Sequence, residues 1–465
     1  MISERPRETH ELLARYDVPG PRYTSYPTVP YWTDPPTADQ WVTHLGRRLE
    51  EAPGDRPGET PAGGALYVHI PFCESLCTYC GCNTKITRNH GMGAPYVDAV
   101  LAEWRLYRER LPGRFPLAEL HLGGGTPTFL EAESLGRLVD GLAGTCEVLG
   151  DAEFSIEADP RVTTREHLAA LAERGFTRLS LGIQDFDPRV QEAVNRVQSA
   201  DQVAQVVDEA RGLGFRSINF DLIYGLPFQT QESIEGTVAV VSRLRPDRIA
   251  FYGYAHVPWI KPWQRRFTED DLPAGAAKRS LYEAGRGLLE AAGYREIGMD
   301  HFALETDPLR QASDSRRLHR NFMGYTSRFI LPLIGLGVSS IGDAGDAFAQ
   351  NDKVLETYLA RIGRGELPVF RGHVLDAEDQ VLRRHILNLM TRLETDWSHP
   401  ADRVEFLDRA LERLAPLADD GLVELKGTSC RVTPTGRAFL RNICMALDAR
   451  LARKSPDHAL FSRSI

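Results

Sequence analysis

The sequence lacks the features that would place it in a membrane or on a nucleic acid. No apolar run approaches the roughly 20 residues that a membrane-spanning helix requires. The first residues, MISERPRETHELLARYD, carry charges throughout and do not resemble a signal peptide. Basic residues are not in excess, since the formal net charge is −9, whereas broad binding to a phosphate backbone requires a basic surface. We therefore predict a cytoplasmic protein with no nucleic-acid partner and no membrane partner.

Cysteine is scarce outside one short segment. Only seven cysteines occur in 465 residues, and four of them lie between Cys73 and Cys82. An odd number with one tight cluster, in a cytosolic chain, indicates metal binding rather than disulfides. The three scattered cysteines are interpreted as small buried hydrophobic side chains.

Short apolar runs alternate with amphipathic helical patterns from residue 65 to about residue 254. The runs are ALYVHI (65–70), ELHLGG (119–124), EFSIEA (153–158), RLSLGI (178–183), SINFDLIY (217–224) and DRIAFYGY (247–254). Such alternation is typical of a parallel α/β sheet or barrel. Six strands favour a partial (β/α)6 barrel over the complete eight-stranded form. An open doubly wound sheet is the alternative.

We divide the chain into three parts. Residues 1–64 are predicted to form an N-terminal leader arm, residues 65–345 a barrel domain with an extension, and residues 346–465 a mainly helical domain. The leader ends in a Pro/Gly-rich loop at 50–64 and contains RYTSYP (22–27), which is too aromatic for a disordered arm. The chain closes with a helix, strand, turn, strand and helix, a winged-helix-like order. Because the chain is acidic, we expect this part to pack as a lid rather than bind DNA.

The tight cysteine cluster reads CxxxCxxC over Cys73, Cys77 and Cys80, directly after the first predicted strand. Thiolates are the usual protein ligands of iron–sulfur clusters. Three thiolates from one loop leave the fourth iron of a cubane open to a substrate or cofactor. A structural zinc normally takes four protein ligands, and Cys82 would supply the fourth, so zinc is the alternative.

A glycine-rich turn, GGGTPT (123–128), ends the second predicted strand. Glycines permit a tight turn and close approach of the backbone to a ligand. Simple termination of the strand is the alternative interpretation.

These motifs carry a resemblance to a known family. CxxxCxxC after the first strand, with Tyr79 just before the last cysteine, resembles the radical S-adenosylmethionine (SAM) superfamily. Further segments resemble one family within it, the oxygen-independent coproporphyrinogen III oxidases. They are RYTSYP (22–27), LYVHIPFC (66–73), CTYCGCN (77–83), GGGTPT (123–128), IEADPR (156–161), LSLGIQDFDPRVQEAVNR (179–196), DLIYGLP (221–227), YAH (254–256), GMDHFA (298–303), LHRNFMGYTS (318–327) and GLGVSSIGD (335–343). The RYTSYP leader and the extra Cys82 are specific to this family.

The resemblance implies a radical SAM barrel and its cofactors. A 4Fe–4S cluster would be held by Cys73, Cys77 and Cys80, with SAM, two per chain, bound beside it. Tyr67 and Glu157 are implied as catalytic residues, Tyr67 near the sulfonium of SAM. Tyr79 would lie against the adenine of SAM. The residues implied around SAM are Tyr67, Tyr79, Gly124, Gly125, Thr126, Glu157, Gln184, Arg196, Asp221, Ala255 and Ile341.

The resemblance also implies a reaction and its partners. The family converts two propionates of coproporphyrinogen III to vinyl groups by a SAM-derived 5′-deoxyadenosyl radical, giving protoporphyrinogen IX in haem biosynthesis. It implies an electron donor such as a flavodoxin, and we expect a monomer. A tetra-acid substrate requires cationic or amide donors, and the candidates are Arg22, Arg316, Arg317 and Arg320. Met323 stands where many members carry Gln.

Two other functions are open at this point. A haem-binding radical SAM paralogue would be expected to lack the RYTSYP leader and Cys82. A winged-helix regulator that senses iron–sulfur status would need a basic recognition helix.

Two variants follow as expectations from the sequence. We expect Tyr23 and Tyr26 to cover the barrel mouth and flank the substrate, with a structural strap as the alternative. A chain lacking residues 1–30 should then fold and cleave SAM but not decarboxylate the substrate. We expect Gly125→Val to weaken SAM binding and leave the cluster intact.

Overall fold

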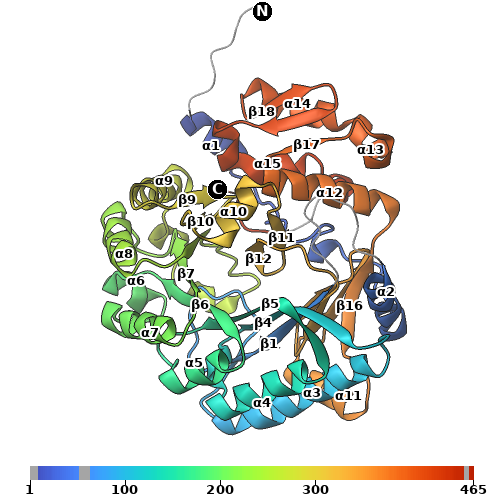
Figure 1. Cartoon of the computed structure of the whole chain (residues 1–465). Coiled ribbons are helices and arrows are strands. Elements are labelled where there is room, and N and C mark those ends of the chain that lie inside the picture. The colour runs from blue at the N-terminus through green and yellow to red at the C-terminus, as the bar shows by residue number, and fades with distance from the viewer. Residues whose placement is uncertain (1–8, 52–62, 455–459, 465) are drawn as a thin grey trace, which may run out of the picture.

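The predicted alternation of strands and helices is confirmed. The computed structural model describes residues 9–51, 63–454 and 460–464, and within them twelve strands form one sheet. Its centre consists of neighbouring parallel strands that curve around a common interior (Figure 1). These strands are β1 (Gly64–Ile70), β4 (Phe115–Gly124), β5 (Cys146–Ala158), β6 (Phe176–Gln184), β7 (Ser217–Tyr224) and β8 (Arg248–Gly253).

Amphipathic helices cover the outside of this curved sheet (Figure 1). In the first of them, α3, the side chains of Tyr96, Val97, Val100 and Trp104 are all at most 2% exposed. The helices between the parallel strands are α3 (Gly93–Arg108), α4 (Ala132–Ala143), α5 (Arg165–Ala172), α6 (Pro188–Ala193), α7 (Ala200–Gly212) and α8 (Gln231–Leu244). In the described ranges, no helix is both long enough and apolar enough to cross a membrane.

The sheet extends beyond the six predicted strands at both edges. The strand β13 pairs parallel to β1, and β14, β15 and β16 continue from it in antiparallel order. At the other edge, β10 and β9 add to β8 in antiparallel order. The bounds are β9 (Arg295–Ile297), β10 (His301–Ala303), β13 (Leu333–Leu336), β14 (Ile341–Asp343), β15 (Ala347–Asn351) and β16 (Val369–Val374). The predicted boundary after residue 345 falls within this sheet, so we propose a domain boundary after Val374.

Further helices and two short ribbons complete this part of the chain. The helices are α2 (Ala38–Glu50), α9 (Gly275–Ala291), α10 (Pro308–Asp314) and α11 (Leu355–Gly363). The ribbons pair β2 (Phe72–Cys73) with β3 (Lys85–Ile86), and β11 (His319–Asn321) with β12 (Gly324–Thr326).

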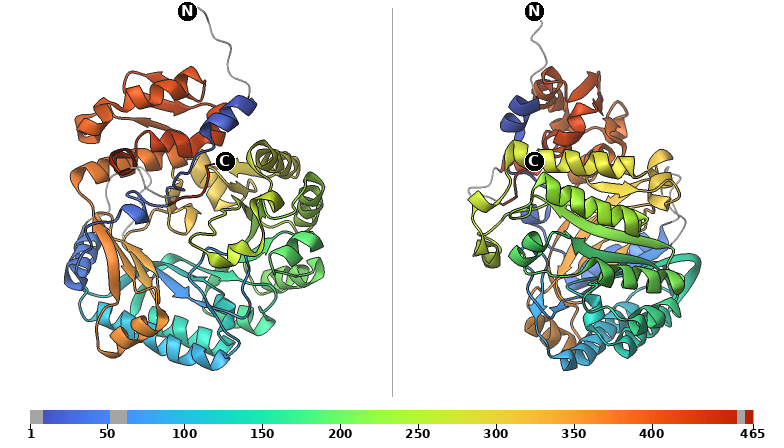
Figure 2. Two further views of the ribbon diagram at one scale, coloured as in Figure 1. Left: turned by 180° about the vertical axis from the view of Figure 1, so that it is seen from behind. Right: turned by 90° about the vertical axis from the view of Figure 1, so that its left-hand side faces the viewer.

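The C-terminal part forms a separate core above the curved sheet (Figures 1 and 2). Its helices are α12 (Ala377–Arg392), α13 (Glu405–Asp408), α14 (Ala410–Asp419), α15 (Leu440–Met445) and α16 (Ala449–Arg453). Its strands β17 (Glu394–Asp396), β18 (Val423–Lys426) and β19 (Ser429–Val432) form a small antiparallel sheet. The predicted winged-helix-like order at the end of the chain is present. It consists of helix α14, strands β18 and β19 with the turn between them, and helix α15.

The leader is built into this C-terminal core. Helix α1 (Thr9–Tyr16) and both tyrosines of RYTSYP belong to the same apolar cluster as α12 and α15. Tyr23 is 4% and Tyr26 2% exposed. The hydroxyl of Tyr23 donates to Asp448 at 3.0 Å, and that of Tyr26 accepts from the amide of Ala449 at 3.1 Å. The hypothesis that these tyrosines flank a substrate is therefore wrong.

The leader's place in this core also changes the expectation for truncation. A chain without residues 1–30 would lose part of the C-terminal core, so we expect it to be destabilised rather than to fold normally. The Pro/Gly-rich loop predicted at 50–64 lies largely outside the described residues.

Replacing Tyr23 with phenylalanine tests this structural role. The substitution removes the donor to buried Asp448 and keeps the ring, so we expect a loss of about 1–3 kcal/mol in stability. Thermal denaturation followed by circular dichroism should show a lower midpoint, with SAM cleavage unchanged below it. Tyr31→Phe is the control, because its hydroxyl bonds the carbonyl of Lys454 at a more exposed site. Equal midpoints for wild type and Tyr23→Phe would contradict the role.

Candidate active site

A cavity of about 570 Å³ occupies the inside of the curved sheet. It extends from the cysteine loop at the carboxyl ends of the strands to the hairpin β11–β12. Alternate positions of the strands line it, because successive side chains of a strand point to opposite faces. The strand residues that line it include Glu119 and His121 of β4, Glu153, Ser155 and Glu157 of β5, Arg178, Ser180, Gly182 and Gln184 of β6, Ser217, Asn219 and Asp221 of β7, and Arg248 and Tyr252 of β8. The intervening residues of these strands form the apolar core.

The cysteine loop lies at one end of this cavity. Cys73, Cys77, Cys80 and Cys82 all line it. The Sγ of Cys73 lies 3.3 Å from the hydroxyl of Thr126, and the Sγ of Cys80 accepts from the amide of Cys82 at 3.4 Å. A hydrogen bond with the Cys82 side chain lowers the pKa of Cys80 to about 6. Burial raises the pKa of Cys73 to about 11, and coordination to a metal would deprotonate such a thiol.

The donor set of these cysteines is the one that holds iron–sulfur clusters. Structural zinc requires four ligands that converge on one point. Among the described residues, no group of three or more His, Cys, Asp or Glu side chains converges in this way. The three thiols of CxxxCxxC all line the same open cavity, and thiolates are the usual protein ligands of iron–sulfur clusters.

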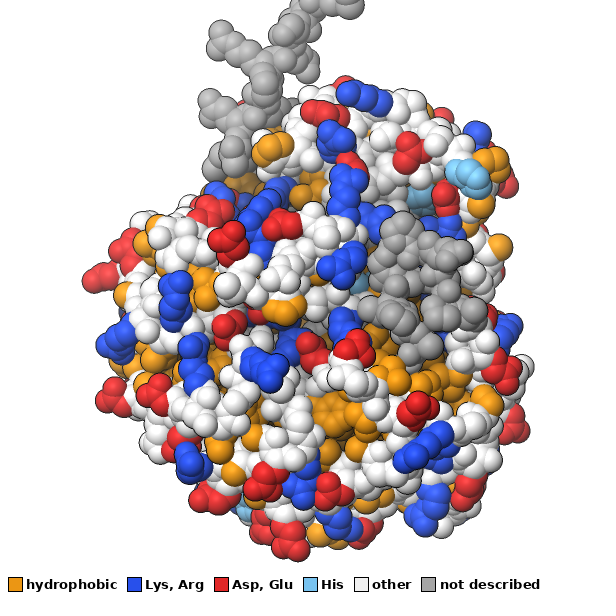
Figure 3. Space-filling model, in the orientation of Figure 1, with side chains coloured by type: hydrophobic (Ala, Val, Ile, Leu, Met, Phe, Trp, Pro, Cys, Tyr) orange, Lys and Arg blue, Asp and Glu red, His pale blue; other side chains and the backbone are white. Residues whose placement is uncertain are grey.

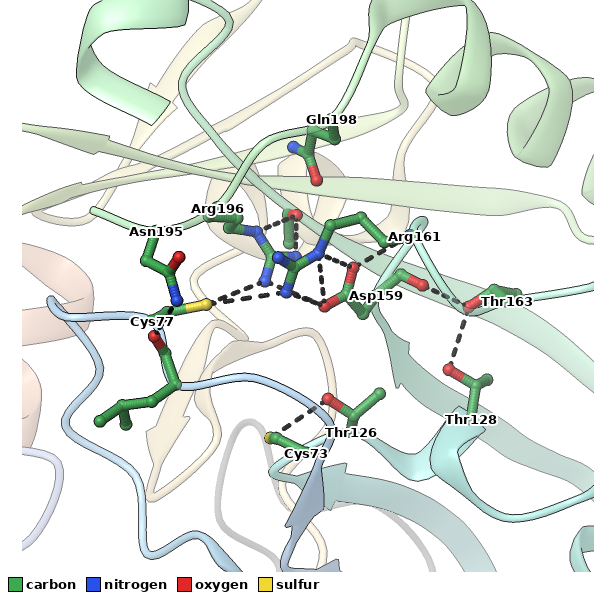
Figure 4. A network of polar contacts seen from close by, with 12 residues as sticks. Cys73, Cys77, Thr126, Thr128, Asp159, Arg161, Thr163, Asn195, Arg196 and Gln198 are labelled. Carbon is green, nitrogen blue, oxygen red and sulfur yellow. Dashed lines mark hydrogen bonds and ion pairs between the residues drawn. The ribbon is translucent and has the colours of Figure 1, made fainter. Parts of the chain in front are cut away.

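Two arginines, buried Arg196 and half-buried Arg161, reach the thiol of Cys77 (Figure 4). Arg196 Nη1 lies 3.6 Å and Arg161 Nη2 3.7 Å from its Sγ. Both guanidinium groups also donate to the carboxylate of Asp159, Arg161 at 2.6 Å and Arg196 at 3.1 Å. Burial alone would raise the pKa of Asp159, but the charges of Arg196 and Arg161 hold it below its ordinary value. One carboxylate therefore orients two cations beside a predicted cluster ligand.

The glycine turn holds β4 against the cysteine loop. The amide of Gly125 donates to the carbonyl of Ile70 at 2.7 Å, and the amide of Gly124 donates to Glu157 at 3.1 Å. Gly124 has φ +114°, which disfavours any side chain. A Cβ at Gly125 would lie 2.7 Å from the carbonyl oxygen of Pro71 and 2.9 Å from that of Phe72. The backbone just before Cys73 thus needs a glycine at this turn.

This contact changes the expected effect of a side chain at Gly125. We expect even Gly125→Ala to displace residues 71–73, to cost about 1–3 kcal/mol by overpacking, and to lower iron occupancy together with SAM affinity. Iron analysis and calorimetric SAM titration of the reconstituted protein measure both. Gly81→Ala is the control, because a Cβ there meets no atom within 4 Å. Full iron occupancy with weakened SAM binding would instead support the expectation drawn from the sequence.

Glu157 lies at the centre of the predicted cofactor residues. Desolvation in the cavity opposes ionisation, but hydrogen bonds from His121 and the amide of Gly124 hold the pKa of Glu157 below its ordinary value. His121 Nε2 is 3.4 Å from its Oε1. Burial and the nearby charge of Glu157 raise the pKa of Asp221 to about 6. Two carboxylates whose pKa values are shifted in opposite directions thus face the same cavity.

Most of the predicted cofactor residues come together here. Those that line the cavity are Tyr79, Gly124, Gly125, Thr126, Glu157, Gln184, Arg196 and Asp221. Tyr67 is not in the lining, but its ring stacks on that of His121 with centroids 5.8 Å apart. The carbonyls of Ala255 and Tyr79 both accept from Nε2 of buried Gln264, each at 3.2 Å. Ile341 lies on β14, away from the lining.

The four arginines predicted to bind substrate do not line this cavity. Arg22 donates to the carbonyl of Gly253, and Arg316 pairs with Glu394 at 2.6 Å. Arg317 is exposed and donates to Ser315, and Arg320 is buried over the ring of Tyr325. Their proposed contacts with the carboxylates of a substrate therefore stay a prediction that this cavity does not support.

Other arginines, which no sequence motif indicated, also line the cavity. They are Arg88, Arg161, Arg178 and Arg248. Arg178 pairs with Glu153 and Arg248 with Asp307, both inside the sheet. For Arg178 and Arg248, the available signal was a charged residue within an otherwise apolar strand, which indicates a side chain on the face opposite the apolar core. Met323 also lines the cavity, on the turn between β11 and β12.

Comparison with known proteins agrees with this geometry. The model of the Radical SAM superfamily matches residues 67–241. The chain is 39% identical over 464 residues to the oxygen-independent coproporphyrinogen III oxidase of Pseudomonas aeruginosa, covering 98% of each chain. It is 39% identical over 450 residues to that of Escherichia coli, covering 96% of each. The solved structure of the Escherichia coli enzyme, described as a radical SAM enzyme, superposes with a TM-score of 0.86 at 37% identity, covering 96% of this chain and 100% of that one.

Proposed function

Because the chain belongs to the family of oxygen-independent coproporphyrinogen III oxidases, we propose that it converts coproporphyrinogen III to protoporphyrinogen IX by radical SAM chemistry. Two propionate side chains are oxidatively decarboxylated to vinyl groups. Similarity over nearly the whole of both chains carries this proposal. The relatives compared above bear the name of the oxidase, and none supports a haem-binding paralogue or an iron–sulfur regulator.

Anaerobic turnover tests the function directly. Reconstituted protein is incubated with SAM, a reductant and coproporphyrinogen III, and the tetrapyrrole products are separated and identified by mass. We expect loss of two carboxyl groups and formation of 5′-deoxyadenosine. Production of 5′-deoxyadenosine without any decarboxylated tetrapyrrole would refute the substrate assignment.

Cys73, Cys77 and Cys80 are the proposed ligands of a 4Fe–4S cluster. With SAM bound to its open iron, the cluster would supply the electron that cleaves SAM to methionine and the 5′-deoxyadenosyl radical that takes hydrogen from the substrate. Asp159 holds Arg161 and Arg196 against Cys77, which places positive charge beside a thiolate. Thr126 offers a hydroxyl to Cys73 from the glycine turn.

The polar lining of the cavity is the proposed SAM site. Ionised Glu157 suits a ribose hydroxyl or the amino group of methionine, since a carboxylate accepts charge-assisted hydrogen bonds. Gln184 of β6 and Asp221 of β7 line the same cavity as Glu157. Asp221 pairs in register with Gly182 of β6. Tyr79 offers a ring face for adenine. We propose two SAM molecules per chain and keep Tyr67 and Glu157 as the proposed catalytic residues.

Arg88 is the proposed contact for a propionate of the substrate. Its side chain is exposed at the edge of the cavity, and no described carboxylate forms an ion pair with it. A guanidinium in such a position can bind a carboxylate through two parallel hydrogen bonds.

Arg88→Gln tests this contact. Hydrogen bonds to charged groups contribute about 1.5–3 kcal/mol, so we expect the KM for coproporphyrinogen III to rise about tenfold to a hundredfold. The uncoupled cleavage of SAM should be unchanged. Arg316→Gln is the matched control, since this arginine pairs with Glu394 outside the cavity. A larger effect at Arg316 than at Arg88 would reverse the assignment.

The remaining partners are also proposals. A net charge of −9, and the mixture of basic and acidic side chains on the face shown in Figure 3, support a protein without a nucleic-acid partner. We propose a monomer in the cytoplasm that takes electrons from a donor such as a flavodoxin.

A further inference from the structure

The surface beside the cysteine loop carries positive charge on an otherwise acidic chain. Residues 254–268 contain Lys261, Arg265 and Arg266, and the acidic residues Glu269, Asp270 and Asp271 follow them. This segment follows β8 and lies toward the viewer in the left view of Figure 2. The ammonium of Lys261 donates to the carbonyl of Cys82 at 3.1 Å, and the indole of Trp263 donates to that of Cys80 at 3.0 Å. The cationic segment therefore rests directly on the cysteine loop.

Two further cations lie near the loop: Lys353, which follows β15, and Arg371 of β16. The side chain of Asn83 donates to the carbonyl of Lys353 at 2.9 Å. Burial and the charges of Arg371 and Lys261 lower the pKa of Lys353, so the three cations share one region. None of the three forms an ion pair with a carboxylate of the described residues. The exposed turn at Cys82 thus lies between unpaired positive charges.

Large apolar side chains are exposed in the same place. Trp259 is 47% and Ile260 52% exposed beside Lys261, and Val354 is 56% exposed beside Lys353. Ile86 is 40% exposed, next to Lys85, which pairs with Glu356 two residues after Val354. Exposed apolar groups gathered within a polar rim mark interaction sites. We call the surface formed by Ile86, Trp259, Ile260, Lys261, Lys353 and Val354 the cysteine-loop face.

We propose that the cysteine-loop face is the docking surface for a small acidic redox protein that reduces the cluster. This inference rests on the proposed function. Positive charge around an apolar centre suits a partner with a negative rim, because complementary charge speeds encounter and fixes orientation. A second copy of this chain docking through the same face would set its cations against each other. The donor would supply one electron to the iron–sulfur cluster that Cys73, Cys77 and Cys80 would hold, and no bond would form or break in this transfer.

Comparison of two electron sources tests the proposal. The rate of 5′-deoxyadenosine formation is measured in the full-length reconstituted enzyme, with either dithionite or reduced flavodoxin, an acidic flavoprotein, as the donor. For Trp259→Ala/Ile260→Ala and for Lys353→Glu, we expect the KM for flavodoxin to rise about tenfold, as for central interface residues. The rate with dithionite should stay within about twofold of wild type, because a small reductant needs no docking surface. Added salt should weaken the flavodoxin-driven rate of wild type.

Matched changes elsewhere serve as controls. Leu411→Ala removes an exposed leucine of α14, 39% exposed, and Arg243→Glu reverses an exposed charge on α8. Neither should alter the KM for flavodoxin. Equal KM values in all variants would overturn the docking surface, as would a dimer that dissociates only in Trp259→Ala/Ile260→Ala. If the wild type forms no 5′-deoxyadenosine even with dithionite, the proposed function fails instead.

Discussion

Alanine at Cys73, Cys77 or Cys80 is expected to remove the iron–sulfur cluster and with it all cleavage of SAM. Each thiol is proposed to bind a separate iron, and a loop with three ligands has no replacement for any of them. Anaerobic wild type should contain about four irons per chain, and each variant close to none. Iron and sulfide analysis together with electron paramagnetic resonance of the reduced protein measures this.

Cys82→Ala is the control for these three variants. Cys82 lies in the same loop and lines the same cavity, but it is outside CxxxCxxC. We expect Cys82→Ala to keep the cluster and to cleave SAM. Loss of metal from Cys82→Ala with retention in Cys73→Ala would overturn the ligand assignment. Zinc bound by all four cysteines would overturn the iron–sulfur interpretation.

The second large effect is expected at Asp159, which is 6% exposed between two arginines. Asp159→Ala would leave Arg161 and Arg196 without their carboxylate beside the cysteine loop. Breaking a buried ion pair by removing one partner costs about 3–5 kcal/mol, because the remaining charge stays buried and unpaired. We therefore expect a lower midpoint of thermal denaturation and weaker retention of the cluster through Cys77.

Asp140→Ala is the matched control, because Asp140 binds Arg174 through two hydrogen bonds of 2.9 Å at the surface. Its side chain is 60% exposed, and exposed pairs contribute at most about 1 kcal/mol. Asp159→Asn should fall between the two, since an amide still accepts one hydrogen bond. Equal stability losses for Asp159→Ala and Asp140→Ala would show that the buried network is not a stabilising unit.

The parallel strands were predictable because each one is a short apolar run between helical patterns. β7 was predicted at the residues where it occurs, and β1 differs by one residue. β5 begins at Cys146 rather than near residue 153, since its first residues mix apolar and polar side chains without regular alternation and are mostly exposed. The strands from β9 to β15 were not predicted, because segments of three to five residues carry no usable periodicity.

The polar lining of the cavity was also present in the sequence, but it was recognised only at the residues that the family resemblance implied. In β5, Glu153, Ser155 and Glu157 alternate with apolar neighbours. β7 repeats the pattern with Ser217, Asn219 and Asp221. When apolar and polar residues alternate along a strand, one face of the strand packs in the core and the other face is polar and accessible to solvent. The runs were instead interpreted only as strands of a parallel sheet, so Arg178 and Arg248 were missed.

The sequence by itself determined the chemistry held in single loops. CxxxCxxC and the glycine turn are recognisable because their spacing needs only a few consecutive residues. Tertiary structure alone decided which charged side chains face the cavity and what the leader does. Asp159 and Arg196 are 37 residues apart, and Tyr23 and Asp448 are 425 apart. The position of an arginine depends on strand register and on a distant carboxylate that neutralises it, and neither leaves a local pattern in the chain.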